Sequence, residues 1–593
     1  QRYGLTPYNA LQNGFFILER VKLLKRNNTA GDILKMKDEL RSLSLAILLS
    51  FIAIYSVNYF FGIDKKSAVQ RQISEIEQAA EQFKHPAAEK ISPAAIKTTE
   101  DAVAEDLRIK FENNSVAGSI RLKGARFDDL YLTKYNVSLE ENSPKVELLK
   151  PAQTANQYFA DLGWLSLDKN LALPTANTIW KTQDTALTPD KPVVLNWENG
   201  QGLMFIRKIS MDKDYLFTVD DTVINNTKEE IELFPYALIS RNIKDMVQTR
   251  SVVHEGMNGV INNTLHELKY KDLDSDDSES FETSGGWLGF SDRYWFSALI
   301  LGNQDKAKVT FKNNGDYNYQ ADFLGSRVIL PAGGETSYSY RLFSGAKEVK
   351  LLDKYTKENH IPKFDLAVDF GWYYFLTKPF FYILDFLYGF LGNMGWAILL
   401  FAALLRLCMF PIANKSYTSM AKMKALQPKI NDIRSKYGDN QMLIQQATME
   451  LYKREKINPA SGCLPLLIQI PVFFSLYKVL NIAIEIRHAP FIGWIKDLSA
   501  PDPLTLSQIL HIYVPGFIDI GLWPIFMGFT MWMQQKLNPA PVNKDQARMF
   551  ALMPVFFTFM LGHFASGLVI YWTLSNILSI IQQKAIMHKN GVE

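Results

Sequence analysis

Apolar and polar positions divide the chain into a short apolar segment near its start, a long polar region and an apolar last third. Residues 42–63 contain no charged side chain, with Arg41 before them and Asp64 after them. At about 1.5 Å per residue, one helix of this length crosses a hydrocarbon core of about 30 Å. The stretch is long for a signal peptide and no small-x-small cleavage site directly follows it, so we predict a retained membrane anchor.

The polar region has the pattern of a β domain. Between residues 107 and 355, runs such as GLMFIRKI, YLFTV and TSYSYRLF are rich in β-branched and aromatic residues, and turn clusters such as WENGQG and PAGGE separate them. Many short strands without helices between them predict an all-β sandwich. Residues 64–106, rich in Glu, Gln, Ala and Lys, are predicted to form a linker that includes a short helix.

The apolar texture returns beyond this domain. Residues 356–390 mix aromatic side chains with Asp365, Asp369, Lys378 and Asp385. These charges argue against a simple span and favour an amphipathic helix that lies in the membrane interface. Five candidate spans follow, at about residues 392–413, 463–484, 517–537, 549–562 and 564–583.

Lysine and arginine are unevenly distributed among the connecting segments. Residues 1–41 carry eight and residues 414–461 carry nine, whereas residues 485–516 carry two. Because cytoplasmic loops are enriched in these residues, the N-terminal arm, the 414–461 loop and the C-terminus are predicted to be cytoplasmic, and the β domain to lie outside. Apolar positions at helical spacing on both sides of a Gly-Asp turn predict that the 414–461 loop is a helical hairpin with a basic exterior.

One arginine interrupts the first candidate span. Arg406 is the single charge between Asp385 and Lys415, and an arginine at mid-span costs roughly 2.5–3.5 kcal/mol on insertion scales. Its side chain either snorkels to the cytoplasmic interface or faces a wet cavity, where its donors attract carboxylates and hold water. Polar residues in the other spans favour the cavity, although interhelical hydrogen bonding also explains each of them singly. They are Gln469, Ser475, Asn481, Gln534, Gln535, Trp572, Thr573, Ser575 and Asn576.

Composition and motifs exclude several classes of function. A net charge of +3 over 593 residues makes no strong case for nucleic acid, and the two cysteines, Cys408 and Cys463, both lie in apolar runs and make no disulfide framework. Without HExxH or GxxxxGK[ST], the sequence predicts no metal site and no nucleotide cofactor. We find no catalytic constellation in it and predict that the protein is not an enzyme. No carboxylate lies inside the five spans, since Glu485 and Asp519 lie at their edges, and this argues against a proton-coupled transporter.

Long motifs carry a specific resemblance to a known family. SYTSMAKMKALQPKINDIRSKYGDN, NPASGCLPLLIQIPVFFSLYKVL and ASGLVIYWTLSNILSIIQQ resemble the YidC membrane-protein insertase family. GWLGFSDRYWFSALI and GAKEVKLLDKY resemble its large Gram-negative periplasmic domain. The resemblance covers roughly residues 40–585, and the N-terminal arm departs from the family, whose members usually begin close to the first span.

The resemblance implies a polytopic α-helical membrane protein of the bacterial inner membrane, with six transmembrane helices, a five-helix insertase core and an all-β periplasmic supersandwich similar to sugar mutarotases. Both termini would be cytoplasmic. The expected segments are the cytoplasmic arm 1–41, the anchor 42–63, the periplasmic linker 64–106, the β-supersandwich 107–355, the interfacial helix 356–390, the core 391–585 with its cytoplasmic hairpin 414–461, and the cytoplasmic tail 586–593.

The resemblance also implies a hydrophilic groove that opens to the cytoplasm and to lipid. The family's groove arginine matches Arg406. The groove residues are predicted to be Arg406, Gln469, Gln534, Gln535, Tyr571, Trp572 and Asn576. The substrate-capturing residues of the hairpin are predicted to be Met420, Met423, Lys422, Lys424 and Arg434. Methionines adapt to varied apolar partners, and ordinary packing at the bilayer surface remains the alternative for these two.

The implied function is that of an insertase and chaperone. It would move short hydrophilic segments of nascent membrane proteins across the inner membrane and release apolar segments into lipid, alone or with the Sec translocon. Expected partners are nascent membrane proteins, Sec translocon components, the lipid bilayer, and the ribosome and signal-recognition targeting factors at the cytoplasmic face. The alternatives are a small-solute membrane transporter and a membrane-tethered periplasmic carbohydrate-binding protein.

Overall fold

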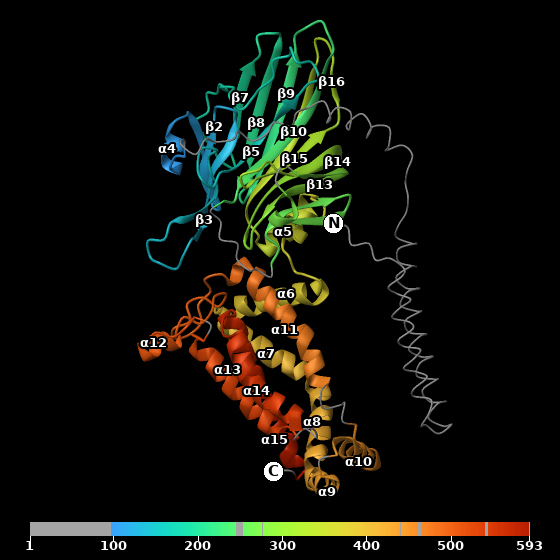
Figure 1. Cartoon of the computed structure of the whole chain (residues 1–593). Coiled ribbons are helices and arrows are strands. Elements are labelled where there is room, and N and C mark those ends of the chain that lie inside the picture. The colour runs from blue at the N-terminus through green and yellow to red at the C-terminus, as the bar shows by residue number, and fades with distance from the viewer. Residues whose placement is uncertain are drawn as a thin grey trace, which may run out of the picture. The chain divides into compact units, whose positions relative to one another are not determined.

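The computed structural model describes most of the chain beyond the linker (Figure 1). The described residues are 96–244, 253–274, 277–438, 440–458, 464–516, 518–539 and 544–591. The predicted N-terminal arm, the anchor and most of the linker lie outside them, and so does Cys463. Strands follow one another along the first part of the described chain, and helices along the second.

Within the described residues, the β domain (residues 108–346) contains 17 strands, and the many short strands predicted from its β-branched and aromatic runs are confirmed. They are β1 (Arg108–Glu112), β2 (Val116–Arg121), β3 (Arg126–Asn136), β4 (Lys145–Leu149), β5 (Tyr158–Leu165), β6 (Ala186–Leu187), β7 (Val193–Glu198), β8 (Leu203–Met211), β9 (Leu216–Asn225), β10 (Ile231–Asn242), β11 (Gly256–Ile261), β12 (Thr264–Lys269), β13 (Ser278–Ser291), β14 (Trp295–Asn313), β15 (Asn318–Gly325), β16 (Val328–Leu330) and β17 (Glu335–Ala346). Strand β8 shows the reason: every second side chain is buried.

The long strand β14 joins two antiparallel arrays. Its first part, residues 295–300, pairs with β17, and its second part, residues 307–313, pairs with β15. From β17 the pairing continues through β9 and β8 to β7, and from β15 it continues through β10 and β5 to β3. Phe217, Phe290 and Phe343 lie in the core that these arrays bury.

Three buried arginines of this domain share one arrangement. Each arginine pairs with an aspartate and lies over an aromatic ring, an arrangement that satisfies its charge away from water. The pairs are Arg126–Asp161 at 2.7 Å, Arg207–Asp221 at 2.7 Å and Arg241–Asp292 at 2.8 Å. The rings are those of Phe159, Trp180 and Tyr158.

Lys347 follows β17 directly and is 1% exposed, with Nζ donating to Ser291 Oγ at 3.0 Å. Burial lowers the pKa of Lys347 to about 8, against the opposing attraction of Asp292. The pKa of Lys347 is therefore lower in the folded chain than in the unfolded chain. The folded state is most stable above the unfolded pKa of 10.5, where the amine is neutral in both states, and it loses this stability as the pH falls through about 8. At neutral pH the protonated amine therefore opposes folding by up to about 3 kcal/mol.

We expect Lys347→Met to raise the free energy of unfolding of the β domain at pH 7 by about 1–3 kcal/mol. Loss of the hydrogen bond to Ser291 offsets part of this gain. The gain should shrink as the pH rises toward 10, where the wild-type amine is neutral. Denaturant unfolding of the full chain at several pH values measures it. Lys354→Met, on the exposed side of α5 (Val349–Glu358), is the control and should change little. A loss of stability that is equal at all pH values would contradict the assignment.

The helices after α5 form the C-terminal helical region that the sequence predicts (Figure 1). They are α6 (Tyr374–Leu391), α7 (Met394–Cys408), α8 (Phe410–Ala425), α9 (Gln427–Tyr437), α10 (Gln441–Arg454), α11 (Leu464–Ile482), α12 (Leu506–Leu510), α13 (Leu522–Leu537), α14 (Lys544–Leu561) and α15 (Ser566–Lys589). The predicted break between the last two spans is confirmed, since α14 ends at Leu561 and α15 begins at Ser566. Among the described residues, each helix by itself is too short or too polar to cross a membrane, whereas α7 and α8 together have the length and composition of a bent span.

The predicted continuous helix over residues 392–413 is wrong in one respect: it is broken at Met409. Helices α7 and α8 meet there at a bend of 67°. Pro411 lies in the first turn of α8, where it has no N–H to donate to a preceding carbonyl and its ring clashes with the turn before it. The chain therefore changes direction three residues after Arg406.

The predicted interfacial helix over residues 356–390 is shorter than expected. Helix α6 begins at Tyr374, after the end of α5, a short 3-10 turn and Gly371, whose φ of +72° suits glycine. It is amphipathic as predicted: Phe380 and Phe381 are buried, whereas Phe386 and Phe390 are exposed. Lys378 on its inner side forms ion pairs with Asp353 at 2.8 Å and Asp365 at 2.7 Å. The charges that disrupted the apolar pattern are therefore paired.

Candidate functional site

Helix α15 is the central element of the helical region. It contacts α7, α8, α11 and α13, and residues along most of its length are buried. Several of those buried residues are polar, which is unusual for a helix in an apolar bundle. Helix α15 is therefore the element on which the polar contacts of the neighbouring helices converge.

Arg406 lies in the last turn of α7 and is directed at α15. Its Nη2 donates to the backbone carbonyl of Ser575 at 2.8 Å and to Ser575 Oγ at 3.1 Å, and it also contacts Ser579 Oγ. The residue is half-buried. Within the described residues, Nε and Nη1 have no hydrogen-bond partner, so one edge of the guanidinium stays available to a further acceptor.

A second polar contact lies one helical turn away on the same face of α15. Gln469 Nε2 of α11 donates to Tyr571 OH at 2.8 Å, and Tyr571 is 2% exposed. Tyr571, Ser575 and Ser579 follow at intervals of four, so they form one stripe along the helix. Arg406 and Gln469 thus meet one polar face of α15 from two different helices.

The remaining predicted groove residues lie around this stripe. Trp572 is half-buried, and its ring packs edge-on against Phe473 of α11 at 4.6 Å. Asn576 donates to Thr530 Oγ1 of α13 at 3.1 Å. Gln534 lies one turn beyond Thr530 and thus on the same face of α13, with Gln535 next to it, and both are half-buried.

Not every polar residue of the candidate spans belongs to this site. Asn481 lies about 18 Å along α11 from Gln469 and accepts a hydrogen bond from Arg293. Ser475 Oγ on α11 and the side-chain amide of Gln582 on α15 are buried without a hydrogen-bond partner among the described residues. A buried polar group without a partner costs about 1–3 kcal/mol, so these positions favour water or a polar ligand nearby.

The sequence did not identify the direct partners of Arg406. Ser575 stood out only as one polar residue among several, and Ser579 did not stand out. A usable signal exists: hydroxyl side chains at positions 571, 575 and 579 repeat every four residues in an otherwise apolar helix. Such a stripe indicates a polar helix face, although it does not say which helix supplies the opposing group.

The predicted helical hairpin is present as α9 and α10, which pack around Ile430 and Leu451. Four of the five residues predicted in the hairpin lie instead on α8: Met420, Lys422, Met423 and Lys424. Met423 is buried in the same cluster, and Met420 packs at its edge. Lys422 is exposed, whereas Lys424 and Arg434 are half-buried. Packing accounts for the place of Met423, and the capture of substrate by these five residues stays a prediction.

The sequence matches two family models that together cover most of the chain: "YidC periplasmic domain" over residues 108–383 and "60Kd inner membrane protein" over residues 386–592. A protein of Rickettsia bellii named membrane protein insertase YidC is 43% identical, over 92% of this chain and 99% of its own. The protein of the same name from Beijerinckia indica is 44% identical, over 94% and 97%. A crystal structure of an active YidC insertase has 18% identity and a TM-score of 0.35, over 86% of this chain and 98% of its own. These names describe an insertase and state no catalytic activity.

Proposed function

Because this chain belongs to the YidC family of membrane protein insertases, we propose that Arg406 and the polar face of α15 receive the hydrophilic segments of its clients. The chain is an inner-membrane insertase with a periplasmic β domain. Its clients are nascent membrane proteins. The hydrogen bonds of Arg406 with α15 support the proposal, because they hold a charged group against the polar face of an otherwise apolar bundle.

The proposed topology has six transmembrane helices. Residues 42–63 form the anchor, and the five-helix core runs from the α7–α8 pair through α11, α13 and α14 to α15. The lysine and arginine distribution puts both termini and the α9–α10 hairpin in the cytoplasm. The segment boundaries are those that the sequence predicts, with the break at Met409 added and with the interfacial helix beginning at Tyr374.

The proposed mechanism lowers the barrier to moving a polar segment into the bilayer. Unpaired backbone groups in hydrocarbon cost several kcal/mol each, so a hydrated groove partway into the membrane shortens the unfavourable path. Arg406 carries this proposal: one nitrogen holds α15 while Nε and Nη1 stay available to a carboxylate or to water. The client's apolar segment then moves into lipid along the flanking helices, and its hydrophobic burial drives release without a nucleotide.

The cytoplasmic hairpin is proposed to capture clients before they enter the groove. Arg434 on α9, with Lys422 and Lys424 in the last turn of α8 directly before the hairpin, supplies positive charge that suits acidic headgroups, ribosomal RNA or targeting factors. We further propose that the Sec translocon, the ribosome and signal-recognition targeting factors act as partners at this stage. α6 would brace the core from the membrane interface.

Site-specific photo-crosslinking to stalled nascent chains tests this proposal. A photo-reactive residue at Gln534, near the polar face of α15, is expected to crosslink the polar tail of a stalled client several-fold more strongly than one at Ile581. Ile581 is the matched control, because it lies on the opposite side of α15 and is 59% exposed. Equal crosslinking at the two positions, or crosslinking at Ile581 alone, would contradict the proposed path.

A further inference from the structure

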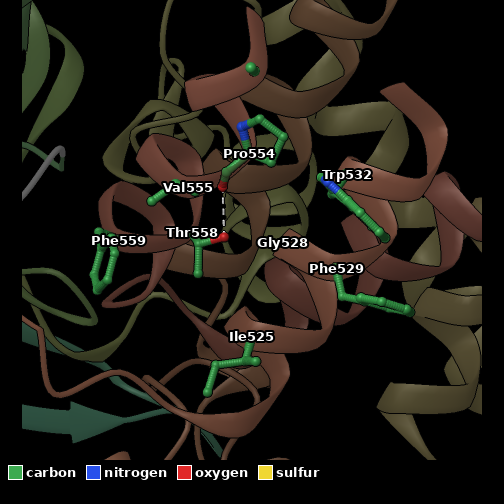
Figure 2. Close-up of a pocket in the computed structure, with 9 residues that line it drawn as sticks. Ile525, Gly528, Phe529, Trp532, Pro554, Val555, Thr558 and Phe559 are labelled. Atoms are coloured by element: carbon green, nitrogen blue, oxygen red, sulfur yellow. Dashed lines mark hydrogen bonds between the residues drawn. The ribbon is translucent and has the colours of Figure 1, made fainter. Parts of the chain in front are cut away.

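An apolar groove runs between α13 and α14 (Figure 2). Helical spacing puts its lining residues on the side of α13 away from Thr530, which contacts α15. Its volume is about 430 Å³. Phe529 and Trp532 of α13 form one wall and Val555 and Phe559 of α14 the other. All four side chains are more than a third exposed, so the groove opens outward.

The floor of the groove is built by a close approach of the two helices. A Cβ atom at Gly528 would lie 2.0 Å from Thr558 Oγ1, so only glycine allows this spacing. Thr558 Oγ1 donates back to the carbonyl of Pro554 at 2.7 Å, drawn as a dashed line in Figure 2. The hydroxyl is therefore satisfied within its own helix, and the groove presents hydrocarbon to a ligand.

Two cations stand at one end of this groove. Lys536 lies one turn beyond Trp532 on α13, and its Nζ is 3.7 Å from the centre of the Trp532 ring. On the antiparallel helix α14, Ala551 lines the groove opposite Trp532. Arg548 lies one turn before Ala551 on the same helix. Both Lys536 and Arg548 are exposed. An apolar slot that ends in two positive charges complements one hydrocarbon chain joined to an anionic headgroup.

We propose that this groove binds one acyl chain of an anionic phospholipid in the cytoplasmic leaflet, with the phosphate between Lys536 and Arg548. The inference rests on the proposed topology, which puts this end of α13 at the cytoplasmic surface. The two positive charges at the cytoplasmic end favour an anionic headgroup over an apolar client helix, which has no matching charge at that point. A single acyl chain is slender enough to lie along the groove.

Photo-labelling of the full chain in phosphatidylcholine vesicles tests the acyl-chain contact. The probes are phosphatidylglycerol and phosphatidylcholine, each with a photoactivatable group on one chain. Val555→Trp fills the groove and is expected to reduce labelling of the α13 and α14 groove peptides about tenfold, equivalent to about 1.4 kcal/mol. Leu552→Trp, at a residue 67% exposed on the same helix but outside the groove, should not change it. Equal labelling of the two variants would overturn the site.

The headgroup contact is tested with the same probes. The wild-type protein is expected to be labelled by phosphatidylglycerol about ten times more strongly than by phosphatidylcholine. The double variant Lys536→Gln, Arg548→Gln should bring this labelling ratio close to one. The control variant Lys589→Gln should leave the ratio unchanged. A preference that survives the double substitution would overturn the assignment of the phosphate. A photo-reactive residue at Phe529 that crosslinks a stalled client in place of lipid would overturn the choice of occupant. The lipid probes should label the Arg406→Ala variant as strongly as the wild-type protein. A failure of the lipid site is therefore distinguishable from a failure of the proposed insertion path.

Discussion

Arg406→Ala is expected to reduce the insertion of a single-span client with an acidic tail about tenfold or more. A hydrogen bond to a charged group contributes about 1.5–3 kcal/mol, and the substitution removes both the bond to the tail and the charge that attracts it. It also leaves the hydroxyl of Ser575 without its donor from α7. Insertion in living cells depleted of the wild-type protein, scored by protease protection of the tail, measures the effect.

The matched variants separate charge from geometry. Arg406→Lys retains the charge but loses the planar fork, so it should restore part of the activity. A client whose tail aspartates and glutamates are changed to amides should depend less on Arg406 than the acidic client does. If alanine supports full insertion of the acidic client, Arg406 does not have the role proposed for it.

Arg207→Ala is expected to destabilise the β domain by about 3–5 kcal/mol, because it leaves Asp221 buried without its counter-charge. The pair is almost completely buried, with Arg207 1% and Asp221 3% exposed. Arg207 Nη2 also donates to the carbonyl of Leu162 at 2.9 Å, so the substitution removes a link between strands. Chemical unfolding of the full chain, followed by protease sensitivity of the β domain, measures the loss.

Two further variants serve as controls for this result. Arg327→Ala breaks a salt bridge of similar length, 2.8 Å to Glu232, but both side chains are 41% exposed, so the loss should be below about 1 kcal/mol. Arg207→Met with Asp221→Leu removes both charges and should recover much of the stability. Insertion by Arg207→Ala below its unfolding temperature should stay near wild type, since the proposed path lies in the helices. If insertion is instead lost in parallel with unfolding of the β domain, the function lies in that domain.

Local patterns along the chain were sufficient for most of the architecture. Side chains alternate with period two in strands such as β8, and apolar residues recur at helical spacing in α9 and α10, so element types are readable without knowing their partners. The break at Met409 was not predicted, although Pro411 signals it. In the sequence alone, a proline in the first turn of a new helix cannot be distinguished from a proline inside a continuous apolar helix. Only the bend between α7 and α8 shows which of the two Pro411 is.

The β domain, the apolar helical region and the isolated arginine of the first candidate span are all readable from the amino-acid order. Periodicity, charge and long motifs are properties of neighbouring residues, so no knowledge of the packing is needed to find them. The contacts of Arg406 with Ser575 and Ser579, 169 and 173 positions away, emerge only when the helices are packed. Such contacts depend on how each helix is rotated about its axis and on which helices lie together. That rotation is set by the burial of all the faces at once and is not encoded in any single segment.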